Sequence, residues 1–174
     1  MKVSPEALEE MKIPLFLVER GGEITYHGPG QMVVYPILGL KDYGYGVVRY
    51  VDQLEEIIIR VLRDFDIEGE RDPLNRGVWV NGDKIASLGV AIKRWVSFHG
   101  FALNYETDLG YFDLMHPCGL VGKKMTTMAK ILGREISRDS LIERICFHFQ
   151  QVFEREWEEK KLDDVIREDP AGKL

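Results

Sequence analysis

The sequence predicts an α+β domain in which a mixed, largely antiparallel sheet is flanked by helices. Three observations lead to this prediction: β-rich runs gather between residues 78 and 105, an amphipathic helix pattern covers 47–65, and a second helical stripe begins after Ser137. No repeat, low-complexity tract or linker divides the 174 residues. At roughly 100–200 residues per domain, residues 1–174 are expected to form a single domain with a charged tail from about residue 160.

Two strands are expected before the first long helix. Segment 14–19 is apolar and includes the β-branched Val18, and it runs into the turn residues Arg20-Gly21-Gly22. Residues 31–37 form the second candidate strand, with Pro36 near its end, where the missing N–H costs no ladder hydrogen bond. The loop between the two strands carries four of the 17 glycines.

The middle of the chain is expected to contain one helix and a β-meander. Apolar residues recur at steps of three and four from Val47 to Phe65, which is typical of a helix that packs one face on a core. Asn81-Gly82 lies between two β-rich runs and favours a type I′ hairpin turn. A further strand over 95–105 follows closely enough to extend the meander.

The last third of the chain is expected to begin with turns and to end with a long helix. Residues 106–124 show little periodicity, and 126–132 are expected to form a short helix that ends at Gly133. Ser137 is a suitable N-cap for the long helix. The apolar stripe of this helix consists of Leu141, Ile142, Ile145, Phe149, Val152, Phe153 and Trp157.

Charge and cysteine content exclude several functional classes. With 23 Lys+Arg and 29 Asp+Glu, the net charge is −6, which argues against a general binder of nucleic-acid phosphates. Two cysteines supply neither a disulfide framework nor a four-thiolate metal site, so a reducing compartment is expected. The sequence shows no apolar run of signal-peptide or membrane-spanning length. We therefore expect a cytoplasmic protein that binds neither nucleic acid nor a membrane.

The stretch from Arg20 to Gln31, RGGEITYHGPGQ, is the first candidate for a functional site. Its glycines let the backbone approach a ligand closely, and Tyr26 and His27 add an aromatic ring and a titratable ring. It contains neither of the glycine patterns of nucleotide-binding loops. The alternative interpretation is a glycine-rich hairpin loop in which His27 only makes local hydrogen bonds.

Lys84 lies just past the predicted turn at the start of an apolar strand. If its ammonium points inward, it needs a partner anion or a lowered pKa. The alternative is an ordinary solvated lysine of the hairpin, which is the usual state of this residue type.

Of the two cysteines, only Cys118 has the surroundings of a nucleophile. Pro117 and Gly119 leave its sulfur unshielded, whereas Cys146 lies in an apolar helix, where cysteine usually packs as a small hydrophobe. A thiolate at Cys118 would need a nearby base or positive charge. The candidates for that group are Lys84, His27, His99 and His116. Metal binding by His116, Cys118 and distant histidines lacks a zinc-type spacing.

Taken together and in order, the motifs RGGEITYHGPGQ, KIASLGVAI, HGFALN and PCGL resemble those of the lipoyl(octanoyl) transferases. The resemblance implies a fold like that of the lipoate and biotin protein ligases, with an acyl tunnel under the glycine-rich loop. It implies Cys118 as the nucleophile and Lys84 as the second catalytic residue. It further implies substrate binding by Arg20, Gly21, Gly22, Glu23, Ile24, Thr25, Tyr26, His27, Ser87, Leu88, Gly89, Gly100, Phe101 and Ala102.

The activity implied by the resemblance is transfer of an octanoyl group from acyl carrier protein, through a cysteine thioester, to a lysine of lipoyl domains. The acceptors would be the lipoyl domains of 2-oxoacid dehydrogenase complexes and the glycine cleavage H protein, and neither a cofactor nor a metal is implied. An acidic enzyme would need local basic residues to bind an acidic carrier. The candidates are Lys93, Arg94, Lys123, Lys124, Lys130 and Arg134. The alternative is that they are ordinary solvated surface charges.

One departure from the family concerns the N-terminus. Members begin with a further segment that includes a stretch resembling EHPxVxTxG, and this sequence starts after it, so the N-terminal part of the family fold is expected to be absent. A late start site, a separate partner chain that supplies the segment, or a shortened form would each account for this. Two other functions stay open: an ATP-dependent lipoate or biotin-type protein ligase, and a non-catalytic protein that binds acyl groups or lipoyl domains.

Overall fold

The computed structural model describes residues 3–22, 24–115 and 124–161. Its centre is a five-stranded sheet in the order β1-β5-β4-β3-β2, and every neighbouring pair of these strands is antiparallel. The strands are β1 (Gln31–Val34), β2 (Glu70–Arg71), β3 (Val78–Val80), β4 (Asp83–Lys93) and β5 (Val96–Asn104). The sequence-based prediction of an α+β fold with a largely antiparallel sheet is confirmed.

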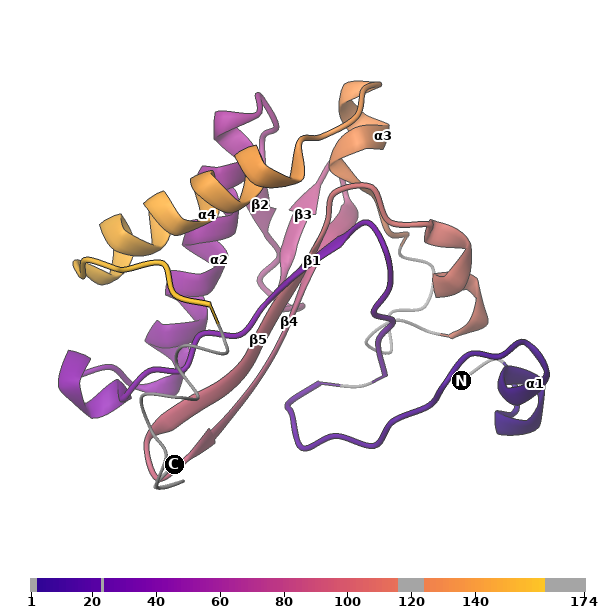
Figure 1. Cartoon of the computed structure of the whole chain (residues 1–174), viewed down its shortest axis with the longest axis horizontal. Helices are drawn as coiled ribbons and strands as arrows, with labels where there is room; N and C mark the ends of the chain where they lie inside the picture. The colour runs from indigo at the N-terminus through magenta and orange to yellow at the C-terminus, as the bar shows by residue number, and fades with distance from the viewer. Residues whose placement is uncertain (1–2, 23, 116–123, 162–174) are drawn as a thin grey trace.

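Two long helices cover one face of this sheet. They are α2 (Val47–Asp64) and α4 (Arg138–Phe153), which pack against each other (Figure 1). The other face carries the N-terminal segment with α1 (Pro5–Glu10) and the 3₁₀ turn η2 (Leu109–Leu114) (Figure 1). The remaining elements are the 3₁₀ turn η1 (Leu40–Tyr43) and the short helix α3 (Met128–Leu132).

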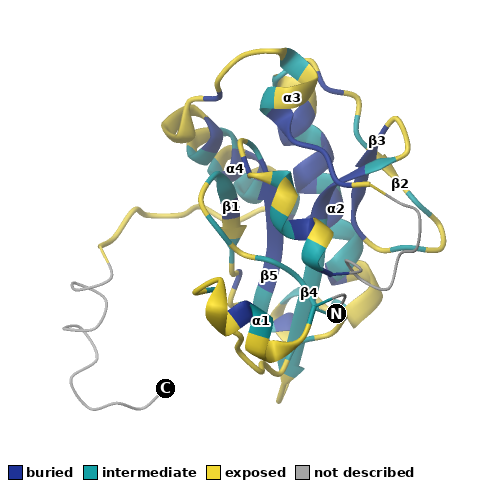
Figure 2. Cartoon of the chain, turned by 90° about the vertical axis from the view of Figure 1, so that its right-hand side faces the viewer, coloured by how far each residue is buried: buried dark blue, intermediate teal, exposed yellow. Residues whose placement is uncertain are grey.

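The hydrophobic core lies between the helices and the sheet. Buried residues concentrate along α2, β3 and β5 (Figure 2). In α2 the apolar stripe places Leu54, Ile58 and Leu62 against the sheet, and all three are almost completely buried. Removing such side chains from water, at roughly 1.5–3 kcal/mol each, is the main stabilisation of this layered arrangement.

The local signals for turns and caps are confirmed. Asn81 and Gly82 have φ angles of 51° and 81°, as a type I′ turn requires, and they join β3 to β4. Ser137 caps α4, since its side chain accepts a hydrogen bond from the N–H of Ser140. Helix α3 ends at Gly133, whose φ angle of 66° is left-handed.

Three boundaries differ from the prediction. Segment 14–19 is not a strand but irregular chain, and its apolar side chains are largely exposed because no described strand pairs with it. The strand predicted over 31–37 stops at Val34, because Pro36 lacks an N–H for the ladder. Helix α4 ends at Phe153, where Glu154 adopts a left-handed conformation, so Trp157 lies outside the helix and is half exposed.

Within the described part of the chain, none of the helices has both the length and the apolar character needed to cross a membrane.

Candidate active site

The segment that follows Arg20 crosses the sheet face opposite the long helices. Leu88 and Phe101 pair across β4 and β5 and pack with the core, so the alternating residues Ser87, Gly89 and Ala102 face the other way. The N–H of Gly21 donates to the carbonyl of Val90 at 2.9 Å, which fastens the segment to β4. The glycine-rich loop therefore rests on a floor of small side chains.

The close approach explains why glycine stands at position 89. A Cβ atom there would lie 2.9 Å from Cδ of Arg20 and 3.0 Å from the carbonyl oxygen of Gly21. Position 100, paired with Gly89, is equally restricted, because a Cβ would lie 2.2 Å from the carbonyl oxygen of Val34. Gly89 lets the loop lie directly against β4, and Gly100 lets the end of β1 lie close to β5.

The described substrate-binding residues predicted from the sequence gather at this place. A small cavity between loop and sheet is lined by Arg20, Thr25, His27, Tyr35, Ser87, Leu88, Gly89, His99, Gly100, Phe101 and Ala102. Gly21 and Gly22 lie at its edge, within reach of the β4 carbonyls of Val90 and Leu88. Glu23 lies outside the described residues. The three separate sequence stretches thus meet in space.

A larger cavity of about 900 Å³ opens next to the small one. It is lined by Ile24, Thr25, Tyr26 and His27 on one side and by the apolar segment 13–18 on another, with Tyr111, Leu114 and Met115 closing the wall. Its size and largely apolar lining are those of a site for a small organic ligand. The apolar side chains of segment 14–19, predicted to form a strand, form part of this wall instead.

Tyr26 is held in place by aromatic contacts. Its ring stacks on that of Tyr111, with the ring centres 4.6 Å apart, and meets Phe112 edge-on at 5.7 Å. Burial, followed by the neighbouring Tyr111 and Asp108, raises the pKa of the Tyr26 phenol. The phenol therefore stays protonated at neutral pH and is available as a hydrogen-bond donor at the cavity.

His27 is tied to the sheet through two residues to which the sequence analysis gave no role. Its Nδ1 atom lies 2.7 Å from Oε1 of Gln31, and Nε2 of Gln31 donates to Oδ1 of Asn104 at 2.9 Å. The Nδ2 group of Asn104 is buried and has no hydrogen-bond partner among the described residues. Gln31 is the last residue of the motif RGGEITYHGPGQ, and Asn104 is the last residue of HGFALN. Their place in these motifs was the feature of the sequence that could have pointed to a role. The local hydrogen bond of the alternative interpretation is present, and His27 also lines both cavities.

Lys84 is buried, with 2% of its surface exposed, so the interpretation as a solvated hairpin lysine is wrong. Its Nζ donates to the carbonyl oxygen of Arg76 at 2.8 Å, and the ammonium lies 5.4 Å from the ring centre of Trp79. These contacts suit a charged lysine, because a carbonyl oxygen and an aromatic face both carry partial negative charge.

An irregularity in the sheet sets the direction of Lys84. The register between β3 and β4 shifts between Val78 and Trp79, so Val78 pairs with Ala86 whereas Trp79 pairs with Lys84. Val78 and Ala86 belong to the core under the helices, and Trp79 does not. The extra residue of this bulge turns Lys84 to the face that carries the glycine-rich loop.

The backbone of Lys84 is also paired with the chain that follows the PCGL motif. Its N–H donates to the carbonyl of Lys124 and its carbonyl accepts from the N–H of Thr126, each at 2.9 Å. Cys118 and His116 lie outside the described residues. Lys84 is not among the residues that line the two cavities.

Cys146 behaves as predicted for a packing residue. It lies partly buried on α4, and burial, with a smaller effect of the Glu159 carboxylate, raises the pKa of its thiol. Among the described residues, no three His, Cys, Asp or Glu side chains are placed to hold a metal ion.

The basic residues proposed to bind a carrier do not form one patch. Lys93 and Arg94 lie at the β4–β5 turn, whereas Lys124 pairs with Lys84 at the opposite end of β4. Lys93 lies nine positions after Lys84 along the strand, which corresponds to about 30 Å. Lys130 lies on α3, Arg134 follows it, and Lys123 lies outside the described residues.

Comparison of this chain with known proteins identifies its relatives. Residues 2–150 match the family model of the lipoyl protein ligase A/B catalytic domain. The chain belongs to this lipoyl protein ligase A/B family. An octanoyltransferase of Syntrophobacter fumaroxidans is 53% identical over 165 residues, which cover 95% of this chain and 72% of the relative. This family member is accordingly an acyltransferase enzyme, like the octanoyltransferases to which it is similar.

Solved structures show the family fold at much lower sequence identity. A bi-partite lipoate protein ligase from Thermoplasma acidophilum has a TM-score of 0.73 at 15% identity, over 95% of this chain and 69% of the other. Biotin protein ligase from Aquifex aeolicus has a TM-score of 0.58 at 13% identity, over 72% of this chain and 53% of the other. The predicted lipoate/biotin protein ligase-like fold of this family member is confirmed.

Proposed function

We propose that this acyltransferase takes an octanoyl group from acyl carrier protein onto Cys118 and passes it to a lysine of a lipoyl domain. The octanoyltransferase relatives support octanoyl transfer in protein lipoylation as the overall reaction. The acceptors would be the lipoyl domains of 2-oxoacid dehydrogenase complexes and the glycine cleavage H protein. A cytoplasmic location, the reducing compartment that suits a reactive thiol, is part of the same proposal.

The observation that carries the proposal is the burial of Lys84 with its ammonium against a carbonyl oxygen. A buried lysine is unusual and is retained where its charge has a use. Its backbone is bonded to Lys124, six positions after Cys118. An ammonium group near a thiol favours the thiolate, which is the nucleophilic form.

The two steps balance if Lys84 shuttles one proton. The Cys118 thiolate attacks the carbonyl of the carrier thioester, and the C–S bond to the carrier breaks as the new thioester forms. The departing carrier thiolate takes a proton from Lys84. The amine of the acceptor lysine then attacks the acyl group on Cys118, loses a proton to the neutral Lys84 and releases the Cys118 thiolate.

The larger cavity is the proposed place for the octanoyl chain. Its apolar lining suits an aliphatic chain, since each buried methylene contributes about 0.8 kcal/mol to binding. The small side chains of Ser87, Gly89 and Ala102 would leave room for the reacting carbonyl group between loop and sheet. His27 would orient the substrate from the rim shared by both cavities.

The test is intact-mass spectrometry after incubation with octanoyl-acyl carrier protein. We expect one octanoyl adduct that maps to Cys118, and we expect it to disappear on addition of a lipoyl domain as the modified domain accumulates. Cys118→Ala should form no adduct, Lys84→Met should acylate far more slowly, and Cys146→Ala is the matched control with normal acylation. Cys118→Ala with parental activity would overturn the proposal.

The same assay separates the two other functions. Turnover that requires ATP and free octanoate, and is indifferent to Cys118, would identify a ligase of the kind seen in lipoate-protein ligase A. Binding of the lipoyl domain without adduct or product would identify a non-catalytic binding protein.

A further inference from the structure

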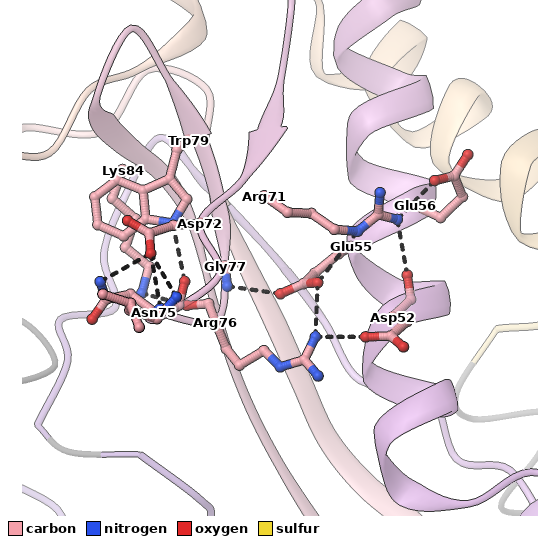
Figure 3. Close-up of polar contacts among 11 residues, drawn as sticks. Asp52, Glu55, Glu56, Arg71, Asp72, Asn75, Arg76, Gly77, Trp79 and Lys84 are labelled. Carbon is pink, nitrogen blue, oxygen red and sulfur yellow. Dashed lines mark hydrogen bonds and ion pairs between the residues drawn. The ribbon is translucent and has the colours of Figure 1, made fainter.

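Glu55 is a buried carboxylate in the middle of helix α2, with 1% of its surface exposed. Its Oε2 atom lies 3.1 Å from Nη1 of Arg76 and 3.5 Å from Nε of Arg71. Its other oxygen, Oε1, accepts the backbone N–H of Gly77 at 2.9 Å (Figure 3). A buried charge is tolerated only when it is paired and hydrogen-bonded, and Glu55 meets both conditions.

One peptide group separates Glu55 from Lys84. The N–H of Gly77 and the carbonyl of Arg76 belong to the same peptide bond, which is trans because the described chain contains no cis peptide. Glu55 accepts a hydrogen bond from the N–H of Gly77, and Nζ of Lys84 donates to the carbonyl oxygen of Arg76 at 2.8 Å (Figure 3). In a trans peptide these two groups point in opposite directions, so the carboxylate and the ammonium lie on opposite sides of one planar unit.

The order of charges along this unit is favourable. The carboxylate lies at the positive, N–H end of the peptide dipole and the ammonium lies at the negative, carbonyl end. Each charge polarises the peptide in the sense that strengthens the hydrogen bond of the other. Both charged side chains are buried, so water screens this arrangement very little.

Arg76 is fixed on both its side chain and its backbone. Its guanidinium binds Asp52 and Glu55 of α2, while its carbonyl accepts from Lys84. The loop over 72–77 is thereby held to α2, and the acceptor for the ammonium cannot turn away. Among the described residues, the charged side chains of the elements packed around Lys84 include Asp52, Glu55, Glu56, Arg71, Asp72, Arg76, Asp83 and Lys124.

We propose that Glu55 is a positioning residue for Lys84, acting through the peptide group between Arg76 and Gly77. Glu55 orients that peptide and strengthens its carbonyl as an acceptor, so that Lys84 is kept charged and aimed at the loop face of the sheet. This inference rests on the proposed role of Lys84 in acyl transfer.

The test compares Glu55→Gln with Glu56→Gln. Both variants remove one carboxylate from α2 and one partner from Arg71, but Glu56 has no bond to Arg76 or Gly77. The readouts are the rate of Cys118 acylation by octanoyl-acyl carrier protein and the pH profile of Cys118 alkylation by iodoacetamide, with far-UV circular dichroism as a check of folding.

We expect Glu55→Gln to slow the acylation of Cys118, because it weakens the effect of Lys84 on the thiol. Without the carboxylate the ammonium is less favoured, so the Cys118 thiolate forms at higher pH and the alkylation profile moves in the alkaline direction. Acylation should fall about tenfold to a hundredfold, the size of effect that a small misplacement of a reacting group causes. Glu56→Gln should stay within about twofold. In a Lys84→Met background, Glu55→Gln should add no further loss.

Two results would overturn the inference in distinguishable ways. If Lys84→Met shifts the profile and a folded Glu55→Gln does not, the positioning role is wrong while the proposed function stands. If Lys84→Met itself has the parental profile and rate, the proposed function fails and this inference fails with it. Should Glu55→Gln not fold, Arg76→Met carries the test, since its side chain is half exposed and it removes a direct partner of Glu55. A parental profile in Arg76→Met then counts against the role.

Discussion

A Cβ atom on Gly77 would lie 2.5 Å from Cε of Lys84 and 3.1 Å from its Nζ. The φ angle of Gly77 is +133°, a conformation that L side chains rarely adopt. The space occupied by the buried lysine therefore exists because residue 77 has no side chain. Any larger residue there must displace either the lysine or the strand beside it.

Gly77→Ala is expected to reduce acyl transfer strongly, since it pushes Lys84 away from the carbonyl of Arg76. The loss should be about a hundredfold in kcat/KM, as for other displacements of a catalytic group by about 1 Å. The control is Gly133→Ala, which also has a positive φ angle but meets nothing within 4 Å. Steady-state kinetics of both variants test this prediction. If Gly133→Ala lost as much activity as Gly77→Ala, backbone strain alone would account for the effect.

Gln31→Ala is expected to release His27 from the sheet. It removes the hydrogen bonds at 2.7 Å and 2.9 Å that connect His27 to Asn104, so the imidazole loses its fixed orientation at the cavity. We expect kcat/KM to fall about tenfold and stability to fall by about 1–2 kcal/mol. Val33→Ala, two residues further along β1 and partly exposed, is the control for shortening a side chain of this strand. A normal kcat/KM in Gln31→Ala would remove His27 from the proposed site.

The two thiols are expected to differ in their reaction with iodoacetamide. Burial raises the pKa of the Cys146 thiol, so little thiolate is present at neutral pH and its alkylation should be slow and should accelerate as the pH rises. Peptide mapping at pH 7 and pH 9, compared with Cys146→Ala, measures the rate at each site. Rapid labelling of Cys146 at pH 7 would contradict its assignment as a packing residue.

Tyr50→Phe is expected to change stability in a way that depends on pH. The fully buried phenol donates to the carbonyl of Pro36 at 3.3 Å, and burial raises its pKa above the ordinary value. The protonated phenol is therefore favoured in the folded state. Its contribution is complete below about pH 10, the ordinary pKa of tyrosine, and is lost as the pH rises through the folded-state pKa.

Urea unfolding at pH 7 and pH 11 measures this difference. At pH 7 the variant should be less stable by about 0.5–1.5 kcal/mol, the value of one hydrogen bond, and at pH 11 the gap should narrow. Tyr35→Phe, at an exposed position, should show neither effect. A gap that widens with pH would contradict the assignment of Tyr50 as a buried neutral phenol.

The parts of the fold that the sequence predicted are those with a local cause. The stripe from Val47 to Phe65 and the caps at Ser137 and Gly133 depend on neighbours within one or two turns of helix, and Asn81-Gly82 defines its own turn. The strand predicted over 14–19 is absent because a strand also needs a partner strand. The apolar residues of this segment line a cavity instead.

The surroundings of Lys84 could be predicted only in part. Its motif indicated a role, but Glu55 lies in an amphipathic helix, where a charged residue usually faces solvent. Glu55 is buried because Arg76 and Gly77, more than 20 residues later, approach it, and no local pattern signals such a pair. The bulge that turns Lys84 toward the loop is likewise a property of two strands together.

The lengths of the strands have a consequence for the behaviour of the protein at high concentration. The inner strands β4 and β5 have 11 and 9 residues, whereas the outer strands β1 and β2 have only 4 and 2. Unpaired backbone groups at a sheet border can recruit strands of other molecules, and a short border offers few of them. Pro36, just beyond β1, removes one more donor from that border. The outer strands of the sheet therefore offer little template for edge-to-edge self-association. Along β4 beyond Ala86, where β3 no longer pairs, the N–H of Gly21 bonds to the carbonyl of Val90.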